Sequence, residues 1–262
     1  MKKQTISKIQ ACKHEKPLTM ITAYDALFAK LFAPQVDMIL VGDSLNMSFL
    51  GESDTLSATL EQMIYHTKAV CNGAPNAFVI CDMPFGSYLD ETSALINAVK
   101  VYQESKADAI KIEGGTEKAS IVKHLTHHGI AVVGHVGLMP QMVRSEGSYK
   151  VKGKDEESAL KVLEDAKAIE EAGACILVIE GVKAEVAAVV AKALTIPVIG
   201  IGAGVDVDGQ VLVWSDMLGL FEDFTPKFVK QYLNGATLVK DAVANYNKEV
   251  ENKSFPANEH TY

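Results

Sequence analysis

The amino-acid sequence predicts an α/β protein, a (β/α)8 TIM barrel that occupies the chain as a single domain. Short apolar runs rich in β-branched residues alternate with amphipathic stretches, which is the pattern of βα units around a parallel sheet. Eight such runs fall within 262 residues, and no Pro-, Gly- or Ser-rich linker interrupts them. This size and alternation fit a closed barrel better than an open sheet.

The predicted strands follow one another in an orderly series. They are expected at residues 18–22, 38–41, 77–81, 109–112, 130–134, 175–179, 198–201 and 211–214. Helices are expected at residues 26–32, 56–70, 93–105, 118–127, 156–171 and 183–194, with one or two more between 226 and 250. The eighth strand is weak because residues 206–209 have the composition of a turn. An open doubly wound sheet therefore remains the alternative fold.

Both ends of the chain are included in the predicted domain, 1–262. Residues 3–13 are expected to form a short N-terminal helix that covers the bottom of the barrel. The polar residues 252–262 are expected to form a loose C-terminal tail, since terminal residues without apolar anchors are seldom held in place.

Charge and hydropathy limit the partners. Lys and Arg number 25 against 33 Asp and Glu, a formal charge of −8, so the protein has no basic field to hold nucleic acid. An anionic substrate would need a local cation or a bound metal ion. No apolar run approaches the roughly 18 residues of a membrane span, and the basic start lacks the apolar segment of a signal peptide. We expect a cytoplasmic protein without a membrane partner.

Four carboxylates follow predicted strands, where a barrel of this kind places its active site. They are Asp43, Asp82, Glu113 and Glu180. Any one of them could simply cap the next helix. Four together favour a bound cation, because converging negative charges repel one another and oxygen ligands without Cys or His select Mg²⁺ rather than Zn²⁺. Asp43, Asp82 and Glu113 come from consecutive strands and are the predicted metal ligands, which leaves Glu180 as a candidate general base.

Two basic residues lie near these carboxylates. Lys111 and Glu113 are two apart on one strand, so both side chains point to the same face and can reach the barrel interior; a structural ion pair is the alternative. His135 is either a satisfied core histidine or a substrate contact, and its expected place at a strand end favours the contact. The segment Gly-Ile-Gly-Ala-Gly at 200–204 is similar to a phosphate-binding loop but lacks the Lys and Ser of a P-loop.

Six motifs in register carry a resemblance to a known family. They are Thr22-Ala23-Tyr24-Asp25, Val41-Gly42-Asp43-Ser44, Asp82-Met83-Pro84-Phe85-Gly86-Ser87-Tyr88, Lys111-Ile112-Glu113-Gly114-Gly115, Gly134-His135-Val136-Gly137-Leu138, and Gly200-Ile201-Gly202-Ala203-Gly204 followed by Asp208-Gly209-Gln210-Val211-Leu212-Val213. From about residue 22 to residue 220 the chain resembles the ketopantoate hydroxymethyltransferase family. The resemblance implies a barrel of the phosphoenolpyruvate and pyruvate type, commonly assembled as a homodecamer.

The resemblance also implies an activity and a site. The reaction would move a hydroxymethyl group from 5,10-methylenetetrahydrofolate to 3-methyl-2-oxobutanoate, giving 2-dehydropantoate for pantothenate biosynthesis. The family's Mg²⁺ ligands fall on Asp43, Asp82 and Glu113, and its proton acceptor falls on Glu180. Substrate contacts are expected from Asp43, Ser44, Asp82, Lys111 and His135. Departures from the family pattern at 144–154 and 214–216 concern loop contacts to the folate or between subunits.

Two rival functions remain open. One is another enzyme of the same barrel type, similar to isocitrate lyase or phosphoenolpyruvate mutase; Glu180 as base and the lack of a strand-end cysteine to act as the lyase acid argue against it. The other is a non-catalytic sensor of small molecules, which would have no need of Glu180 beside an intact ligand set.

Overall fold

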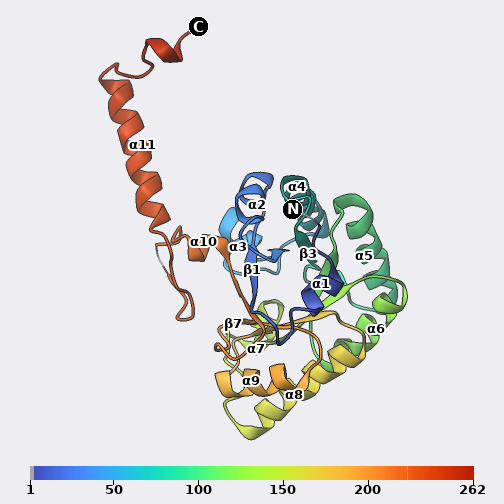
Figure 1. Ribbon diagram of the computed structural model, residues 1–262. Helices are drawn as coiled ribbons and strands as arrows, with labels where there is room; N and C mark the ends of the chain where they lie inside the picture. The colour runs from blue at the N-terminus through green and yellow to red at the C-terminus, as the bar shows by residue number, and fades with distance from the viewer. Residues whose placement is uncertain (1–2, 223) are drawn as a thin grey trace. The chain divides into compact units, whose positions relative to one another are not determined.

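The computed structural model describes residues 3–222 and 224–262 and shows eight parallel strands closed into a barrel (Figure 1). The strands are β1 (Leu18–Thr22), β2 (Met38–Val41), β3 (Phe78–Asp82), β4 (Ala109–Glu113), β5 (Val132–Gly137), β6 (Ile176–Glu180), β7 (Val198–Ile201) and β8 (Gly209–Leu212). Each strand pairs with the next, and β8 pairs with β1. The predicted barrel is confirmed, and closure excludes the open sheet.

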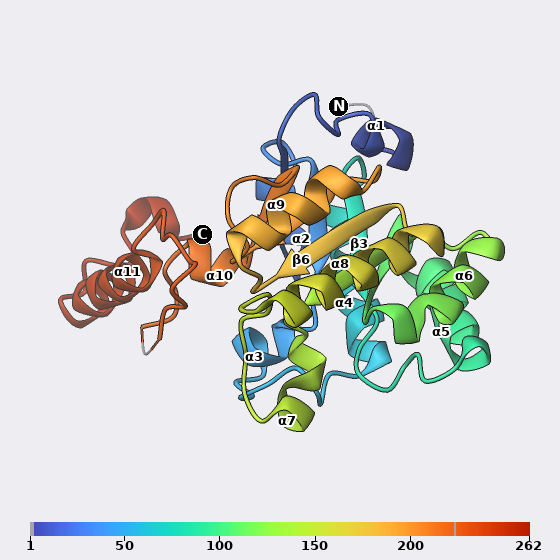
Figure 2. The ribbon, with the colours of Figure 1, turned by 90° about the horizontal axis from the view of Figure 1, so that it is seen from below.

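Helices surround the strands (Figures 1 and 2). The longer ones are α2 (Ala26–Phe32), α4 (Leu60–Gly73), α5 (Glu91–Ser105), α6 (Ala119–His127), α8 (Glu156–Glu171) and α9 (Ala184–Ala193). Short elements lie in the connections that follow β2, β4 and β5, namely α3 (Leu45–Phe49), η1 (Thr116–Lys118), η2 (Pro140–Met142) and α7 (Val143–Glu146). Residues 202–208, all of them described, join β7 to β8 without a helix. The short elements and loops at the strand ends thus form the mouth of the barrel.

Side chains at the helix N-termini explain where several helices begin. Asp25, Asp90 and Asp155 cap α2, α5 and α8, and each carboxylate accepts a backbone N–H three residues further on. Thr59 and Gln62 form a capping box at the start of α4. These caps satisfy N–H groups that have no partner within the helix.

The predicted strand boundaries are off by one residue for β3, β4 and β6 and by two or three residues for β5 and β8. β5 continues to Gly137, so His135 lies within a strand and not at its end. β8 runs from Gly209 to Leu212, two residues earlier than predicted. A Cβ on Gly209 would lie 2.4 Å from the carbonyl oxygen of Leu18, so a glycine is needed where β8 approaches β1. Gly209 is also one of the residues 206–209, whose turn-like composition weakened the prediction of the eighth strand.

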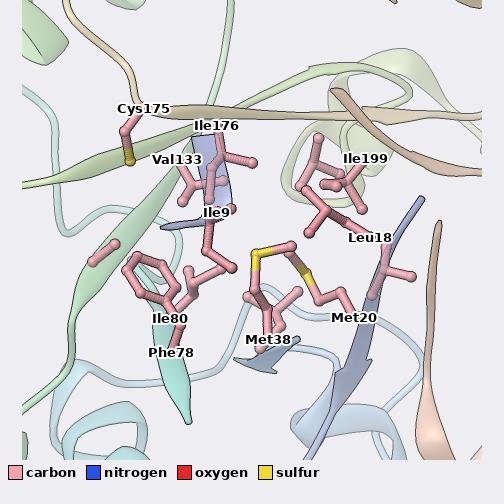
Figure 3. Packing of buried hydrophobic residues seen from close by; sticks show 14 of the residues in the cluster. Ile9, Leu18, Met20, Met38, Phe78, Ile80, Val133, Cys175, Ile176 and Ile199 are labelled. Carbon is pink, nitrogen blue, oxygen red and sulfur yellow. The ribbon is translucent and has the colours of Figure 1, made fainter. Parts of the chain in front are cut away.

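The N-terminal end of the barrel is filled by a core that includes α1 (Ile6–Gln10). This helix is shorter than the predicted 3–13. Ile9 is buried, and Figure 3 shows it among side chains from several strands. The surrounding cluster includes Leu18, Met20, Met38, Phe78, Ile80, Val133, Ile176, Ile199 and Val211. The expected role of the N-terminal helix, covering the bottom of the barrel, is confirmed.

A buried ion pair fixes the segment that follows α1. Lys13 Nζ lies 2.6 Å from Asp208 Oδ2 and donates to the Ala191 carbonyl at 2.9 Å. Asp208 Oδ2 also accepts the Val198 N–H at 2.9 Å. Both charged side chains are less than a tenth exposed. The chain before β1 is therefore tied to β7 and to the residue before β8.

The chain divides into two compact units, Met1–Val213 and Trp214–Tyr262. The barrel is complete within the first. The second holds α10 (Trp214–Met217), α11 (Gly235–Glu251) and η3 (Asn258–His260), so a helix predicted between 226 and 250 is present and the tail contains a short 3-10 turn. One domain over 1–262 stays a prediction. In the described parts of the chain, no helix combines the length and the apolar character that crossing a membrane would need.

Candidate active site

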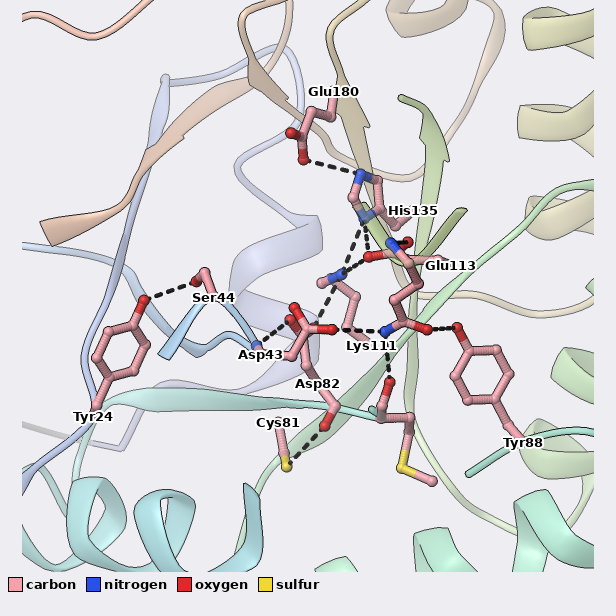
Figure 4. Close-up of polar contacts among 12 residues, drawn as sticks. Tyr24, Asp43, Ser44, Cys81, Asp82, Tyr88, Lys111, Glu113, His135 and Glu180 are labelled. Carbon is pink, nitrogen blue, oxygen red and sulfur yellow. Dashed lines mark hydrogen bonds and ion pairs between the residues drawn. The ribbon is translucent and has the colours of Figure 1, made fainter. Parts of the chain in front are cut away.

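The acidic residues of interest end neighbouring strands of the barrel. Asp82, Glu113 and Glu180 are the last residues of β3, β4 and β6, and Asp43 follows β2 by two residues. The strand register places Asp82 beside Lys111 and Glu113 beside His135. Asp43, Asp82 and Glu113 are all buried. Figure 4 shows that these side chains point toward one another, as the sequence predicts.

Lys111 is the buried cation of this group. Its Nζ lies 3.0 Å from Asp82 Oδ1 and 3.7 Å from Glu113 Oε1. Burial by itself lowers the pKa of Lys111, but the carboxylates of Asp82, Glu113 and Asp43 outweigh burial and raise it above its ordinary value. The ammonium therefore stays charged at neutral pH, and the predicted placement of Lys111 and Glu113 on one face is confirmed.

The carboxylates respond unequally to burial. Burial and the charges of Asp82 and Glu113 raise the pKa of Asp43 well above its usual range. Burial also raises the pKa of Asp82, although Lys111 partly offsets it. For Glu113, burial is outweighed by contacts with His135 and Lys111, so its pKa is lowered and it stays ionised. Negative charge is thus least stable at Asp43.

Gln141 joins the group, and the sequence analysis missed it. Its side-chain Nε2 donates to Asp43 Oδ2 at 2.9 Å and to the Met83 carbonyl at 3.0 Å, while its backbone N–H donates to Glu113 Oε2 at 3.0 Å. Tyr88 Oη donates to Gln141 Oε1 at 2.5 Å. Gln141 comes four residues after the end of β5 and carries no charge, so neither strand-end position nor charge pattern pointed to it.

His135 connects Glu113 to Glu180. Its Nδ1 lies 3.0 Å from Lys111 Nζ and its Nε2 lies 3.3 Å from Glu180 Oε2. Burial and Lys111 lower the pKa of His135, but Glu113 and Glu180 outweigh them and raise it to about 9. When the ring is neutral, the contact with Lys111 requires Nδ1 to accept, because an ammonium has only donors. The neutral ring with Nδ1 as acceptor and the charged ring both carry a proton on Nε2, which faces Glu180 Oε2 at 3.3 Å.

Ser44 lies at the edge of the group. Its Oγ is 2.8 Å from Tyr24 Oη, and it forms no side-chain cap at the start of α3. Burial raises the pKa of Tyr24 to about 12, so the phenol stays protonated at neutral pH. Tyr24 thereby orients the Ser44 hydroxyl.

The buried carboxylates fit a divalent cation in charge and in donor type. Asp43, Asp82 and Glu113 ionised beside one Lys111 ammonium would leave two uncompensated negative charges, and their oxygens are donors that Mg²⁺ prefers. Within residues 3–222 and 224–262, no three acidic, His or Cys side chains are already arranged to hold a metal ion. Gln141, Lys111 and the Asp43 N–H contact these oxygens instead. Coordination would require the carboxylates to exchange some of those contacts.

A closed parallel barrel with buried charged groups at its C-terminal mouth defines the class of protein, a (β/α)8 barrel enzyme. The fold is similar to phosphonopyruvate hydrolase in a complex with oxalate and Mg²⁺, at a TM-score of 0.63 and 12% identity over 98% of this chain and 93% of that one. It is also similar to 2,3-dimethylmalate lyase, a member of the PEP mutase/isocitrate lyase superfamily, at a TM-score of 0.59 and 15% identity over 95% and 98% of the two chains. At these identities the likeness shows the fold alone, a (β/α)8 barrel.

The chain belongs to the ketopantoate hydroxymethyltransferase family, whose model matches residues 3–258. A 3-methyl-2-oxobutanoate hydroxymethyltransferase of Sulfurimonas denitrificans is 66% identical over 261 residues, covering 100% of this chain and 99% of that protein. One from Helicobacter pylori (strain G27) is 57% identical over 256 residues, covering 98% and 95%. The family and the enzyme class expected from the motifs are confirmed.

Proposed function

We propose that the protein transfers a hydroxymethyl group from 5,10-methylenetetrahydrofolate to C3 of 3-methyl-2-oxobutanoate, giving 2-dehydropantoate in pantothenate biosynthesis. The observation that carries the proposal is the buried set of Asp43, Asp82 and Glu113 around Lys111, with Glu180 on the other side of His135. The names of the relatives support the choice of the 2-oxo acid.

The difficulty of the reaction is the loss of a proton from carbon beside a ketone, because negative charge then develops on the ketone oxygen. A Mg²⁺ ion held by Asp43, Asp82 and Glu113 would supply Lewis-acid stabilisation of that charge. Lys111 adds a fixed positive charge at the substrate oxygens. Ser44, oriented by Tyr24, can donate a hydrogen bond to the same substrate.

Glu180 is the proposed general base. Its side chain is 18% exposed, whereas those of Asp82 and Glu113 are 4% and 3% exposed, so it can be reached from the mouth of the barrel. His135 Nε2 lies 3.3 Å from Glu180 Oε2, and we assign it the role of orienting this carboxylate, which leaves the other oxygen to accept the C3 proton. C3 then forms the new carbon–carbon bond to the methylene carbon of the folate, whose two bonds to the folate nitrogens break, so that tetrahydrofolate is the leaving group. Water supplies the hydroxyl of the product, and its other proton and the proton taken from C3 end on the two folate nitrogens.

The other partners follow from the same assignment. We propose small-molecule substrates, a cytoplasmic location and a homo-oligomer, with a homodecamer as the form that the family resemblance implies. The chemistry at C3 depends on the substrates but not on the location or the oligomer.

A lyase or mutase of the same barrel type is the nearest rival. A lyase of this type would need a cysteine in the site to act as the acid, and Cys81 is the cysteine adjacent to Asp82. Burial raises the pKa of Cys81 to about 12, and its Sγ contacts the Asp82 carbonyl. A thiol held this way is poorly suited to proton transfer at neutral pH, which favours the transferase.

The test separates proton removal from one-carbon transfer. With Mg²⁺ and 3-methyl-2-oxobutanoate but no folate, the wild-type protein should exchange the C3 proton for deuterium from solvent, measured by NMR. Glu180→Gln keeps the size of the side chain but cannot accept the proton, so exchange should fall about 10²- to 10⁴-fold while metal and acid still bind. Glu185→Gln, at an exposed glutamate of α9, is the matched control and should exchange normally.

Two outcomes would count against the proposal. Normal exchange in Glu180→Gln would remove Glu180 as the base. Wild-type protein that fails to exchange under saturating Mg²⁺, and still fails when tetrahydrofolate is added, would contradict enolisation at this site; tetrahydrofolate has no methylene to transfer and serves only to complete the site.

A further inference from the structure

Three histidines gather at the C-terminal end of α6, on the outside of the barrel. They are His124, His127 and His128, and the site at the barrel mouth uses none of them. Figure 1 shows α6 next to α5 in the ring of helices that surrounds the strands. The side chain of His124 is 32% exposed, and His127 and His128 are exposed. These rings are therefore accessible to a ligand from solvent.

Two of the three rings lie against each other. The ring centroids of His124 and His128 are 4.5 Å apart, with 46° between the ring planes. Residues four apart are neighbours on one face of a helix, and two histidines at this spacing can bind the same metal ion. Rotation of the two side chains can bring a nitrogen of each ring to within about 2.0–2.1 Å of one ion.

Each of these rings has its Nδ1 turned toward an oxygen that only accepts hydrogen bonds. His128 Nδ1 lies 2.8 Å from the His124 carbonyl oxygen, and His124 Nδ1 lies 3.7 Å from Glu91 Oε2 at the start of α5. These oxygens favour a neutral ring with its proton on Nδ1 and its lone pair on Nε2. Metal-binding histidines in proteins are oriented in the same way, by a carbonyl or a carboxylate behind the ring. The Nε2 atom of each ring is thus available as a ligand.

We propose that His124 and His128 bind one late first-row divalent cation, of the class of Ni²⁺, Cu²⁺ and Zn²⁺, through their Nε2 atoms. Glu91 is the positioning residue that orients His124. Imidazole nitrogen suits these ions, whereas Mg²⁺ selects oxygen. Among the residues that the structure describes, no third His, Cys, Asp or Glu completes a metal-binding group, so water fills the other coordination positions. The site is separate from the buried carboxylates and does not depend on the proposed function.

Calorimetric titration with Ni²⁺ tests the two ligands. The full-length protein carries no affinity tag and is kept saturated with Mg²⁺, so that the carboxylates at the barrel mouth are occupied. The wild type should bind one Ni²⁺ per chain, and His124→Gln and His128→Gln should each weaken binding about 100-fold or more, because loss of a ligand exceeds loss of an orienting partner. His127→Gln removes an exposed histidine of the same helix, and as the matched control it should leave the Kd unchanged.

Glu91→Gln tests the positioning role. The amide keeps the size of the side chain but removes the negative charge that faces His124 Nδ1, so the Kd for Ni²⁺ should rise about tenfold. Glu91→Asp keeps the charge and should recover part of the affinity. Far-UV circular dichroism should be that of the wild type in both variants, since Glu91 is exposed. Unchanged Ni²⁺ affinity in Glu91→Gln would overturn the role given to this residue.

Three results would overturn the metal site. One is unchanged Ni²⁺ affinity in either His124→Gln or His128→Gln. Another is an equal loss in His127→Gln, which would show that exposed histidines bind the ion without pairing. The third is loss of Ni²⁺ binding in Asp82→Ala, which would place the ion at the carboxylates. His128→Gln should exchange the C3 proton of the 2-oxo acid as the wild type does, so failure of this site leaves the proposed function standing.

Discussion

Asp25 and Asp43 both follow a strand of the barrel by a few residues, yet they do different things. Asp25 accepts the Phe28 N–H at 2.9 Å and caps α2. Asp43 is buried, bonds Gln141 and has a raised pKa from burial and from Asp82 and Glu113. A capped helix needs one acceptor near water, whereas several buried carboxylates leave negative charge that a cation or protonation must balance.

Removal of Asp82 should affect the metal most directly. Asp82→Ala takes away one oxygen ligand, and water must fill the vacancy in a coordination sphere that Mg²⁺ keeps near octahedral. We expect Mg²⁺ affinity, measured by calorimetric titration with the 2-oxo acid present, to fall at least tenfold. Asp25→Asn changes a carboxylate that serves as a helix cap and is the control. Unchanged affinity in Asp82→Ala would exclude Asp82 from the metal site.

Gln141 offers a test of buried hydrogen bonding. Gln141→Leu deprives the buried Tyr88 hydroxyl of its acceptor and Asp43 of a donor, so the free energy of unfolding should fall by about 1–3 kcal/mol. Adding Tyr88→Phe removes the stranded hydroxyl and should recover part of that loss. Urea denaturation of the two single variants and the double variant measures the coupling. Strictly additive losses would show that the hydrogen bond between Tyr88 and Gln141 contributes nothing.

Secondary-structure elements are joined by charges as well as by the core. The Lys13–Asp208 pair ties the segment after α1 to the start of β8. Lys13→Met leaves a buried carboxylate without its partner, and we expect a loss of about 3–5 kcal/mol in urea denaturation. Lys16→Met, in a pair whose lysine is 56% exposed, should cost less than about 1 kcal/mol. Equal losses in the two variants would contradict the importance of burial here.

Asp37 connects β1 to the start of β2, and its contacts predict that the stability of the fold depends on pH. It accepts the Thr19 N–H at 2.9 Å and the Lys16 ammonium at 2.7 Å. Burial raises the pKa of Asp37, but these bonds outweigh burial and lower it below its ordinary value of 3.8. A lowered pKa in the folded state means that the stabilisation is present above pH 3.8 and is lost as the pH falls through the lowered value.

Asp37→Asn should therefore be less stable than the wild type by about 1 kcal/mol at pH 7, and the difference should shrink below pH 4. Urea denaturation at a series of pH values measures it. A difference between the two proteins that stays constant across that range would show that the charge of Asp37 is not involved.

The whole barrel was predictable because buried parallel strands are continuously apolar and recur at regular intervals. The strand-end rule then found Asp82, Glu113 and Glu180 without knowledge of any contact. It could not find Gln141, which lies in η2, beyond the end of β5, and contacts the carboxylates through its amide and its backbone N–H. The start of β8 was misplaced because Gly209, needed for close approach to Leu18, is a turn former by composition.

We expect the whole protein to form an oligomer. The expectation comes from the family resemblance, since composition gives no independent sign of it. Sedimentation velocity at micromolar concentration should show a species several times the 28.2 kDa of one chain. A stable monomer under those conditions would contradict it.

The burial of Ile9 and of the Lys13–Asp208 pair has a consequence for synthesis of the chain. Lys13 and Asp208 are 195 residues apart, so Lys13 has no partner for this buried ion pair until the residue before β8 has been synthesised. At 5–20 residues per second that delay is on the order of 10–40 s, during which Ile9 and the open barrel floor face water. Until β8 is made, the apolar side chain of Ile9 is exposed to aggregation in the nascent chain.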